Sequence, residues 1–582
     1  MSSTTSLPKC GEASAARRLR ILLLCSAFNG LSQRAWVELR EAGHWVERQL
    51  AGDADAVRAK VEVFAPDLVI CPFLKERVPV EVWSGRPTIV IHPGPRGDRG
   101  PSSLDWAVMD AEPTWGVTAL QAIEEMDAGP IWGSRSFSMP EAPPRKSDLY
   151  NGAVTDAALE LVHEVAAKAA DPGFEPEPLD YRRPEVTGRL RRPVRRADRS
   201  FSWSDPTEHV LRRIRAADGS PGVSTRLLGQ PVAVFDAHKS RIGGEPTAEP
   251  GTVIGRHHGA VEVATGDGAI WLGHLRPVRD EAPQLKLPAT TVLGGLLEGV
   301  PEAPDGCGYR EIDYRRDGEA GEVGVLSFDF YNGAMSTGQC RRLEAAVRHA
   351  VEQDTQVLVL RGGTTFSNGI HLAMIEAAAD PAAEAWANIT AIDDVCRQII
   401  TCTRQLVVTA LAGNAGAGGV MLALGADRVI VRQGVVLNPH YRTMGLYGSE
   451  YWTYVLPRRV GARVAAEMTT RCDPIGAAGA LRTGLADMVV PDRADFDLAV
   501  TRYAERLAHS PARLALLEDK RSARAADERR KPLEEYRRAE LNQMWRDIVD
   551  DEHGFTEARR AFLLKRPARS TSCTHTRTPL VS

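Results

Sequence analysis

Two stretches of this 582-residue chain combine residue types that could do acid–base chemistry. The first reads IHPGPRGDRGPSSLDWA over 91–107, and Asp127 follows it in EEMDAGPIW. The apolar run TIVI ends directly at His92, which places this histidine at the carboxyl end of a buried strand, where open α/β sheets hold ligands. Glycines in the loop would let backbone approach a substrate closely. The stretch therefore indicates proton transfer beside a bound ligand.

The second stretch lies in the C-terminal half of the chain. FSNG at 366–369 is followed about fifty residues later by GAGG at 416–419, and then by NPHYRTMGLYGSEYWTY at 438–454. Free N–H groups at the start of a helix suit an oxyanion, so GAGG could hold one. A Tyr–Glu pair such as Tyr441 and Glu450 could move protons beside it.

Parallel sheets would position both stretches. LRILLLC at 19–25, a helix and PDLVIC at 66–71 form a βαβ pattern, which predicts a parallel sheet. No G-x-G-x-x-G follows the first strand, so we expect no nicotinamide cofactor. Short alternating strands over about 200–280 predict a small barrel or sandwich. Strands and helices alternate again from about 305.

Composition excludes several function classes. The net charge of −4 gives no reason to expect nucleic acid or membrane partners, and no apolar run approaches the ~18 residues of a membrane span. The N-terminus lacks an apolar signal core, and nine scattered cysteines predict neither disulfides nor zinc, so we expect a cytoplasmic protein. The pair His257–His258 offers too few ligands for a metal and is interpreted as surface. The Arg- and Pro-rich segment 181–199 is interpreted as a solvated linker, or as a basic strip for an anionic cofactor such as CoA.

The first stretch resembles the formyltransferases that use 10-formyltetrahydrofolate. That resemblance implies that His92 and Asp127 form the catalytic pair, although Val90 stands where the family has an asparagine. The segment FSWSDPTEHVLRRIRAADGSPG resembles the start of that family's OB-like C-terminal domain. Residues expected to bind the cofactor in this half are Gln33, Phe73, Leu74, Arg96, Asp98 and Ser102.

The second stretch resembles the crotonase (enoyl-CoA hydratase/isomerase) superfamily over some 250 residues. This resemblance implies an oxyanion hole for a CoA thioester, built from the backbone N–H groups of Asn368 and Gly418. Met421 and His440 stand where hydratases carry carboxylates, which disfavours hydration of an enoyl-CoA. Tyr441 or Glu450 would move the proton, and His371 and Tyr447 are further candidates for cofactor contact.

The combination resembles a family of [NiFe]-hydrogenase maturation proteins. It implies formyl transfer from 10-formyltetrahydrofolate to CoA, followed by decarbonylation of formyl-CoA to carbon monoxide and CoA. It also implies no metal cofactor, and transient contact with other hydrogenase maturation proteins. Two alternatives stay open: a formyltransferase whose second half hydrolyses formyl-CoA to formate, and a CoA-binding scaffold without catalysis.

The expected fold class is α/β, with three domains and two tails. We predict a disordered tail over 1–17, a Rossmann-like formyltransferase domain over 18–185, an OB-like domain over 186–303, a crotonase domain with C-terminal helices over 304–565 and a disordered tail over 566–582.

Overall fold

The computed structural model describes residues 17–241, 248–279, 284–306, 308–491, 493 and 495–566. The two predicted disordered tails lie almost wholly outside these residues. The chain divides into two compact units: residues 1–107, 112–139 and 153–193 form unit 1, and residues 108–111, 140–152 and 194–582 form unit 2. The predicted limits of the three domains stay predictions.

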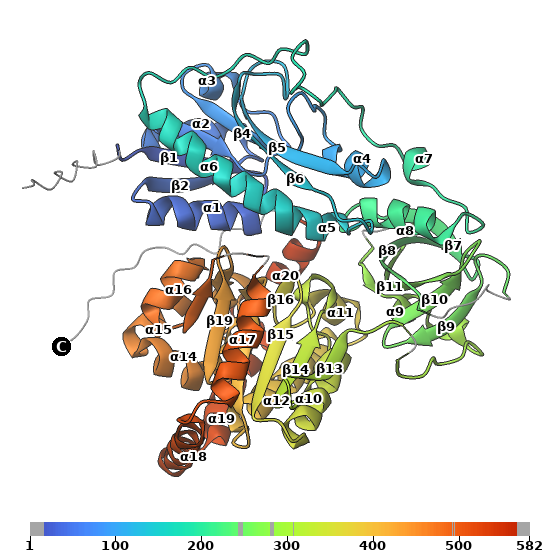
Figure 1. Ribbon diagram of the computed structural model, residues 1–582, viewed down its shortest axis with the longest axis vertical. Coiled ribbons are helices and arrows are strands. Elements are labelled where there is room, and N and C mark those ends of the chain that lie inside the picture. Colours follow the sequence, from blue (N-terminus) through green and yellow to red (C-terminus); the bar gives the residue numbers. More distant parts are fainter. Residues whose placement is uncertain are drawn as a thin grey trace, which may run out of the picture. The chain divides into compact units, whose positions relative to one another are not determined.

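Unit 1 is built on one six-stranded sheet with the order β2-β1-β3-β4-β5-β6, drawn in blue to teal in Figure 1. The strands from β2 to β4 run parallel, whereas β5 and β6 are antiparallel, so the prediction of a parallel sheet holds for only four strands. The loop 122–130 joins β5 to β6 as a hairpin, and it is too short for the crossover that a parallel return needs. The strands are β1 Arg20–Cys25, β2 Trp45–Leu50, β3 Leu68–Cys71, β4 Thr88–His92, β5 Thr114–Gln121 and β6 Ile131–Ser138.

Helices cover this sheet because their apolar faces match its buried strands. Asn29 and Asp53 cap α1 and α2, each accepting hydrogen bonds from backbone N–H groups of the first turn. The helices α1, α2 and α6 pack on the sheet through buried residues such as Leu39, Val57 and Leu161. The helices of this part of the chain are α1 Gly30–Glu41, α2 Ala54–Phe64, α3 Val80–Trp83, α4 Ser103–Met109 and α6 Thr155–Ala170. The short helix α5 Lys146–Leu149 and most of the π-helical turn η1 Tyr150–Val154, which precede α6, belong to unit 2.

The first part of unit 2 is a small antiparallel β structure, drawn in green in Figure 1. Its strands follow the order β7-β8-β11-β10-β9, with β12 paired to β11, and α8 packs a strongly amphipathic face against β8. The elements are α7 Arg196–Arg199, α8 Thr207–Ala216, β7 Val223–Leu227, β8 Gln230–Lys239, β9 Val253–His257, β10 Ala260–Ala264, β11 Ala269–Pro277, β12 Leu287–Pro288, α9 Ala289–Leu293 and η2 Gly294–Leu297. We refer to this part as the barrel domain.

The second part of unit 2, called the crotonase part here, places two sheets together. The main sheet has the order β13-β14-β15-β17-β19-β22, and the small sheet has the order β16-β18-β20-β21. The strands are β13 Ile312–Asp317, β14 Val323–Phe328, β15 Val357–Gly362, β16 Thr365–Ser367, β17 Leu406–Leu411, β18 Asn414–Gly416, β19 Arg428–Arg432, β20 Val436–Asn438, β21 Ile475–Gly476 and β22 Met488–Val490.

Three times the chain passes from a main-sheet strand straight into a small-sheet strand, and this repeat positions the second stretch of the sequence. The pairs are β15–β16, β17–β18 and β19–β20. Because β16 and β18 pair in parallel, the FSNG and GAGG segments emerge at the same edge of the small sheet.

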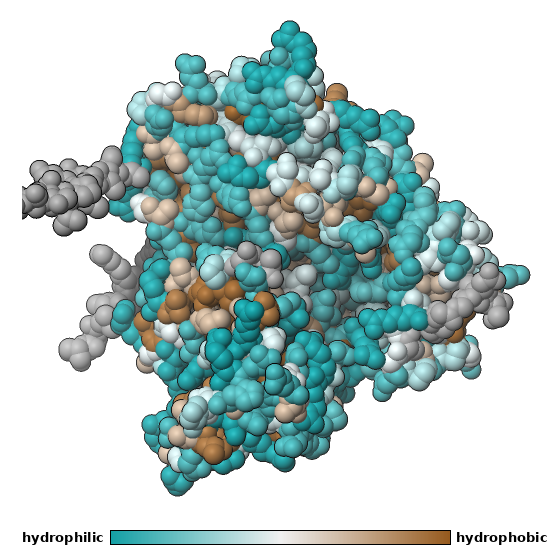
Figure 2. Space-filling model, in the orientation of Figure 1, coloured by the Kyte–Doolittle hydropathy of each residue, from teal (hydrophilic) through white to brown (hydrophobic). Residues whose placement is uncertain are grey.

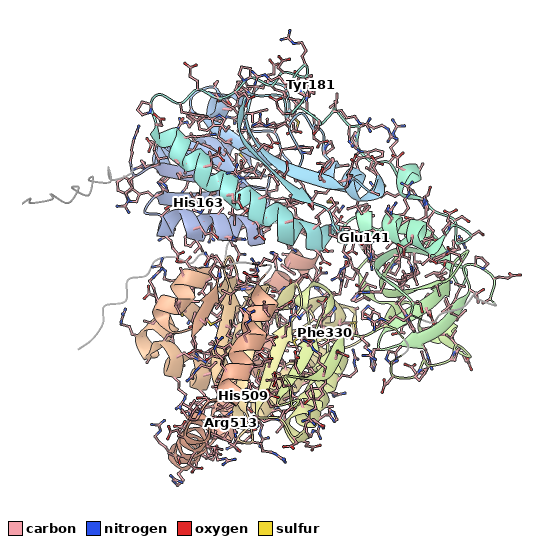
Figure 3. The ribbon with its side chains drawn as sticks, in the orientation of Figure 1. Glu141, His163, Tyr181, Phe330, His509 and Arg513 are labelled. Carbon is pink, nitrogen blue, oxygen red and sulfur yellow. The ribbon has the colours of Figure 1, made fainter. Side chains whose placement is uncertain are left out.

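Helices enclose both sheets of the crotonase part (Figure 1). Ser336 begins α10 with a capping box, and Asp380 followed by a proline begins α12. Phe330, labelled in Figure 3, packs its ring 5.8 Å from that of Phe328 inside this core. The helices are η3 Tyr331–Gly333, α10 Thr337–Glu352, α11 Leu372–Ala377, α12 Pro381–Thr401, α13 Gly418–Leu424, η4 Tyr441–Met444, α14 Trp452–Val460, α15 Ala462–Arg471, α16 Ala477–Thr483, α17 Phe496–Ala508, α18 Arg513–Arg530, α19 Leu533–Ile548 and α20 Phe555–Leu563.

Buried polar groups join the barrel domain to the crotonase part within unit 2. The Arg145 guanidinium lies 2.9 Å from the Asp236 carboxylate of β8 and 3.6 Å from the Asp329 carboxylate that follows β14. The Tyr331 hydroxyl donates to Asp218 over 2.9 Å. The hydrogen bonds and ion pairs of this network form only when the barrel domain and the crotonase part pack in this one arrangement, so the network fixes their packing.

The face seen in Figure 2 is largely hydrophilic, with apolar side chains scattered among polar ones. Among the described helices, none combines the length and the apolar composition that crossing a bilayer requires.

Candidate active sites

The first candidate site lies at the carboxyl end of β4 in unit 1. His92 is the last residue of this strand and is only 5% exposed. Its Nε2 lies 2.9 Å from Oδ2 of Asp98, and its Nδ1 lies 3.7 Å from Oδ1 of Asp127. The structure thus brings together three residues from the sequence analysis, with one carboxylate near each ring nitrogen.

Asp98 has a larger role here than the sequence analysis gave it. The sequence predicts that Asp98 binds the cofactor, but its side chain is buried and hydrogen-bonded directly to His92. Its Oδ1 makes no hydrogen bond among the described residues, and Nε of Arg191 lies 3.8 Å away. Asp98 therefore orients the His92 ring from one side, and Asp127 faces it from the other.

Gly94 makes the contact between His92 and Asp98 possible. A methyl group at this position would lie 2.3 Å from Oδ2 of Asp98 and 2.7 Å from Nε2 of His92. Both distances are shorter than any real van der Waals contact, so a side chain here would push the pair apart.

Asp127 is held by the same glycine-rich loop. Its backbone has a φ of 56°, in the left-handed region, and its Oδ2 accepts the Gly100 N–H at 3.2 Å. A non-glycine residue rarely takes this conformation, and strained residues of this kind gather at functional sites.

The segment 181–191 packs on this loop through backbone hydrogen bonds. Most of its residues are exposed, as the interpretation of 181–199 as a solvated linker predicts, but its first half is fixed to the loop. The Gly188 N–H donates to the Arg96 carbonyl over 2.8 Å, and the Arg99 N–H donates to the Arg189 carbonyl over 3.2 Å. The Tyr181 hydroxyl donates to the Gly97 carbonyl over 3.1 Å, and its position is marked in Figure 3. The backbone of this segment fixes the loop that carries Asp98.

The other residues predicted to bind a cofactor in unit 1 have mixed surroundings. Arg96 forms an ion pair with Glu177 over 2.9 Å. The Gln33 side chain donates to the Phe28 carbonyl over 3.0 Å, and the Phe73 carbonyl accepts the Ser26 N–H over 2.9 Å. The five residues are all half-buried: Gln33, Phe73, Leu74, Arg96 and Ser102. Their contact with a ligand stays a prediction.

The second candidate site lies in the crotonase part, where α13 begins. A methyl group built on Gly369 would lie 3.3 Å from the Gly418 nitrogen, so the FSNG and GAGG segments touch. Gly418 is the first residue of α13, and its N–H accordingly has no partner within that helix. Gly418 can therefore serve as an oxyanion donor, as the sequence analysis predicts.

Asn368 does not offer the donor that was predicted for it. Its backbone N–H donates to the Gly333 carbonyl over 2.7 Å, and its side-chain nitrogen donates to the Asn332 carbonyl over 2.9 Å. Within the described residues, the N–H of Ile370, two positions later, makes no hydrogen bond. The sequence does not show which of the two N–H groups is free to act as the donor, because Asn368 and Ile370 lie in the same short loop.

Tyr441 and Glu450 form a buried pair beside Gly418. The Tyr441 hydroxyl donates to Oε2 of Glu450 over 2.8 Å, and both residues are less than 5% exposed. A methyl group on Gly418 would lie 2.1 Å from Oε1 of Glu450, so this carboxyl group lies directly against the predicted oxyanion donor. Burial and the nearby Asp393 carboxylate raise the pKa of Glu450 to about 8.

Asp393 of α12 is a residue that the sequence analysis missed. It is fully buried, and its Oδ1 accepts the backbone N–H of Glu450 over 2.8 Å. Glu450 has a φ of 59°, and this hydrogen bond helps to hold it there. Burial raises the pKa of Asp393 to about 6. In the sequence, Asp393 is one acidic residue inside an amphipathic helix, so only its position in space reveals its role.

The remaining predicted residues of this half have other partners. His371 is the N-cap of α11, and its side chain accepts a hydrogen bond from the Met374 N–H over 3.2 Å. It therefore stabilises the first turn of this helix. Tyr447 is 38% exposed and stacks near Trp452, so its contact with a cofactor stays a prediction. Met421 is fully buried in α13.

His440 and the Asn368 side chain both lie against Gly416. A methyl group on Gly416 would lie 2.9 Å from Cε1 of His440 and 2.8 Å from Oδ1 of Asn368. Burial lowers the pKa of His440, so its ring is neutral near pH 7.

Comparison with protein families matches each part of unit 2 separately. Residues 193–284 match the formyl transferase C-terminal domain, and residues 332–571 match the enoyl-CoA hydratase/isomerase family. A stretch of 180 residues is 32% identical to methionyl-tRNA formyltransferase of Chloroflexus aurantiacus and covers 31% of this chain and 56% of the relative.

Two relatives match nearly the whole chain. The hydrogenase maturation factor HoxX of Bradyrhizobium diazoefficiens is 46% identical over 559 residues, which cover 96% of both chains. The crystal structure of HypX from Aquifex aeolicus in complex with tetrahydrofolic acid is 39% identical, has a TM-score of 0.89 and covers 97% of this chain and 98% of that chain. Sequence and fold therefore agree over both candidate sites, and the chain belongs to the HypX/HoxX family of hydrogenase maturation factors.

Proposed function

We propose that this protein makes carbon monoxide for the iron of a [NiFe]-hydrogenase, in two steps that use one site each. The observation that carries the proposal is the buried Tyr441–Glu450 pair against Gly418, because it sets a base beside an oxyanion donor. The relative's complex with tetrahydrofolic acid supports folate as the formyl carrier.

In the first step, the formyl group passes from 10-formyltetrahydrofolate to the thiol of CoA. His92 takes the thiol proton, the sulfur bonds to the formyl carbon, the carbon–nitrogen bond breaks and the folate nitrogen receives a proton. Asp98 and Asp127, close to the two ring nitrogens, stabilise the charged imidazole while it holds the proton. The products are tetrahydrofolate and formyl-CoA.

In the second step, formyl-CoA divides into carbon monoxide and CoA. The Glu450 carboxylate takes the proton from the formyl carbon, the carbon–sulfur bond breaks and the thiolate then receives a proton. The N–H groups of Gly418 and Ile370 orient the thioester oxygen. A pKa of about 8 suits this base near neutral pH, because a general base works best when its pKa lies near the working pH.

Hydrolysis to formate is the competing outcome at the same site. It would need a second group to activate water, and the position one turn along α13 from Gly418 carries the buried Met421. An apolar thioether cannot take a proton, which favours decarbonylation. The product would then be used by other hydrogenase maturation proteins, which we propose as transient partners.

The test supplies purified protein with 10-formyltetrahydrofolate and CoA and traps carbon monoxide on a reduced haem protein. We expect carbon monoxide that depends on both substrates. His92→Ala should abolish tetrahydrofolate and carbon monoxide alike, whereas Glu450→Gln should leave tetrahydrofolate production and abolish carbon monoxide. Formate in place of carbon monoxide would contradict the second step. Full activity of both variants would contradict the assignment of both sites.

A further inference from the structure

The hairpin between β9 and β10 holds two imidazole rings side by side. β9 ends at His257 and β10 begins at Ala260, so His258 and Gly259 form a two-residue turn. Both turn residues have positive φ angles, 48° and 93°, as a type I′ turn requires. The two ring centroids lie only 3.7 Å apart. The turn therefore presents two nitrogen ligands at one place on the barrel domain.

The segment that follows the barrel domain brings a carboxylate to the same place. The Arg256 N–H donates to the Pro301 carbonyl over 3.0 Å, and the Ala303 N–H donates to the Arg256 carbonyl over 2.9 Å. This pairing along β9 carries the chain to Asp305, whose Oδ1 lies 3.7 Å from Nε2 of His257. The ligand atoms of His257, His258 and Asp305 all lie within 4.8 Å of one another.

His257 has the orientation of a metal ligand. Its Nδ1 lies 3.0 Å from the Ala303 carbonyl oxygen, which can only accept, so the ring proton is on Nδ1 and the lone pair of Nε2 faces Asp305. Metal-bound histidines commonly donate their other N–H to a carbonyl or carboxylate in this way. Two ligands about 2.1 Å from a tetrahedral ion lie roughly 3.4 Å apart. The observed 3.7 Å is close to this spacing and too long for a hydrogen bond.

His258 also lines a cavity of about 170 Å³ between the barrel domain and the crotonase part. The cavity wall includes the His274 and Tyr309 side chains and the Arg342 guanidinium, whose charge is balanced by the buried Glu311 carboxylate. His258 thus connects the three-residue cluster to a cavity, and three protein ligands with a fourth position left open are the arrangement of many metal sites.

We propose that His257, His258 and Asp305 bind one divalent transition-metal ion, with water or a small ligand from the cavity completing its coordination. Two imidazole nitrogens and one carboxylate oxygen favour Zn²⁺, Co²⁺ or Ni²⁺ over Mg²⁺ or Ca²⁺, which prefer oxygen ligands. This site is separate from both candidate active sites, and it does not depend on the proposed production of carbon monoxide.

The test titrates the metal-free full-length chain with Co²⁺ and follows the visible ligand-field absorption, and Zn²⁺ then displaces the bound ion. We expect one tightly bound ion per chain. His258→Ala and Asp305→Asn should each weaken binding at least about tenfold, since even outer partners of metal ligands are worth 10- to 100-fold. His209→Ala is the matched control: His209 pairs with Asp205 over 3.7 Å in the same domain, and no third ligand accompanies this pair within the described residues.

Folding does not obscure this test, because the Asp305 side chain is 94% exposed and its replacement removes no buried contact. Melting temperatures without metal should be the same for the wild type and Asp305→Asn, and Co²⁺ should raise only that of the wild type. Unchanged binding in both His258→Ala and Asp305→Asn would overturn the proposal. A near-ultraviolet charge-transfer band from thiolate would overturn it as well, because it would assign the bound ion to cysteines.

Discussion

Replacing Asp393 by asparagine should change the acidity of Glu450 while leaving its position intact. An asparagine oxygen can still accept the Glu450 N–H that Asp393 accepts over 2.8 Å. The negative charge that disfavours ionisation of Glu450 is lost. Because Asp393 has a pKa of about 6, it is charged over the pH range in which Glu450 titrates.

The size of the effect can be bounded from the structure. The pKa of Glu450 rises from 4.5 to about 8, which corresponds to roughly 5 kcal/mol against the charged form, with burial as the larger cause and Asp393 next. A charge close to a carboxyl group typically shifts its pKa by about one to three units. We therefore expect Asp393→Asn to lower the pKa of Glu450 by about one to two units.

The assay is the rate of carbon monoxide release from formyl-CoA as a function of pH. In the wild type, this rate should rise with pH and level off above about 8, because the base acts as the carboxylate. In Asp393→Asn, the midpoint should fall by about one to two units. Asp394→Asn is the control, since this neighbour is 46% exposed and pairs with Arg537 over 2.8 Å. An unchanged midpoint in a folded Asp393→Asn protein would refute the role given to this charge.

Three further predictions concern close contacts and buried charge. Gly418→Ala should abolish carbon monoxide release but leave tetrahydrofolate production, measured in the same assay, because its methyl group would lie 2.1 Å from Oε1 of Glu450. Gly94→Ala should lower the rate of formyl transfer at least about tenfold and leave formyl-CoA cleavage unchanged, because its methyl group would separate His92 from Asp98. Glu450→Gln should raise the melting temperature more at pH 9 than at pH 5. Folding raises the pKa of Glu450 to about 8, so this group costs the folded protein no stability at low pH, and the cost grows as the pH rises towards 8. Equal shifts at the two pH values would contradict that assignment.

The sequence was sufficient to predict that His92 ends a buried strand of unit 1 beside a glycine-rich loop. An apolar strand that ends in His92, followed by a glycine-rich loop, has few alternatives in an α/β fold, and β4 ends at this residue. The sequence did not show which of the two carboxylates, Asp98 or Asp127, is hydrogen-bonded to His92. Asp98 lies six residues from His92 and Asp127 lies 35 residues away, and only the turn at Gly94 brings the nearer one into hydrogen-bond contact.

In the crotonase part, the sequence located the site but not all of its donors and charges. The Tyr441–Glu450 pair follows from spacing around a glycine turn, and the structure places the two side chains 2.8 Å apart. The competition for the Asn368 N–H does not follow, because the Gly333 carbonyl that accepts it comes from 35 residues upstream. A local sequence pattern shows which chemical groups a segment carries. The hydrogen-bond partner of a backbone N–H or carbonyl group is set by the tertiary fold.

The two candidate active sites share one device, although their folds differ. In each, a glycine stands where a Cβ atom would collide with a titratable side chain: Gly94 with His92 and Asp98, and Gly418 with Glu450. The backbone thereby brings a proton carrier closer to its partner than side-chain packing would allow. A residue with a side chain at either glycine would lengthen the distance over which a proton moves, and proton transfer requires contact within hydrogen-bond reach. These two glycines therefore constrain the geometry of both candidate sites.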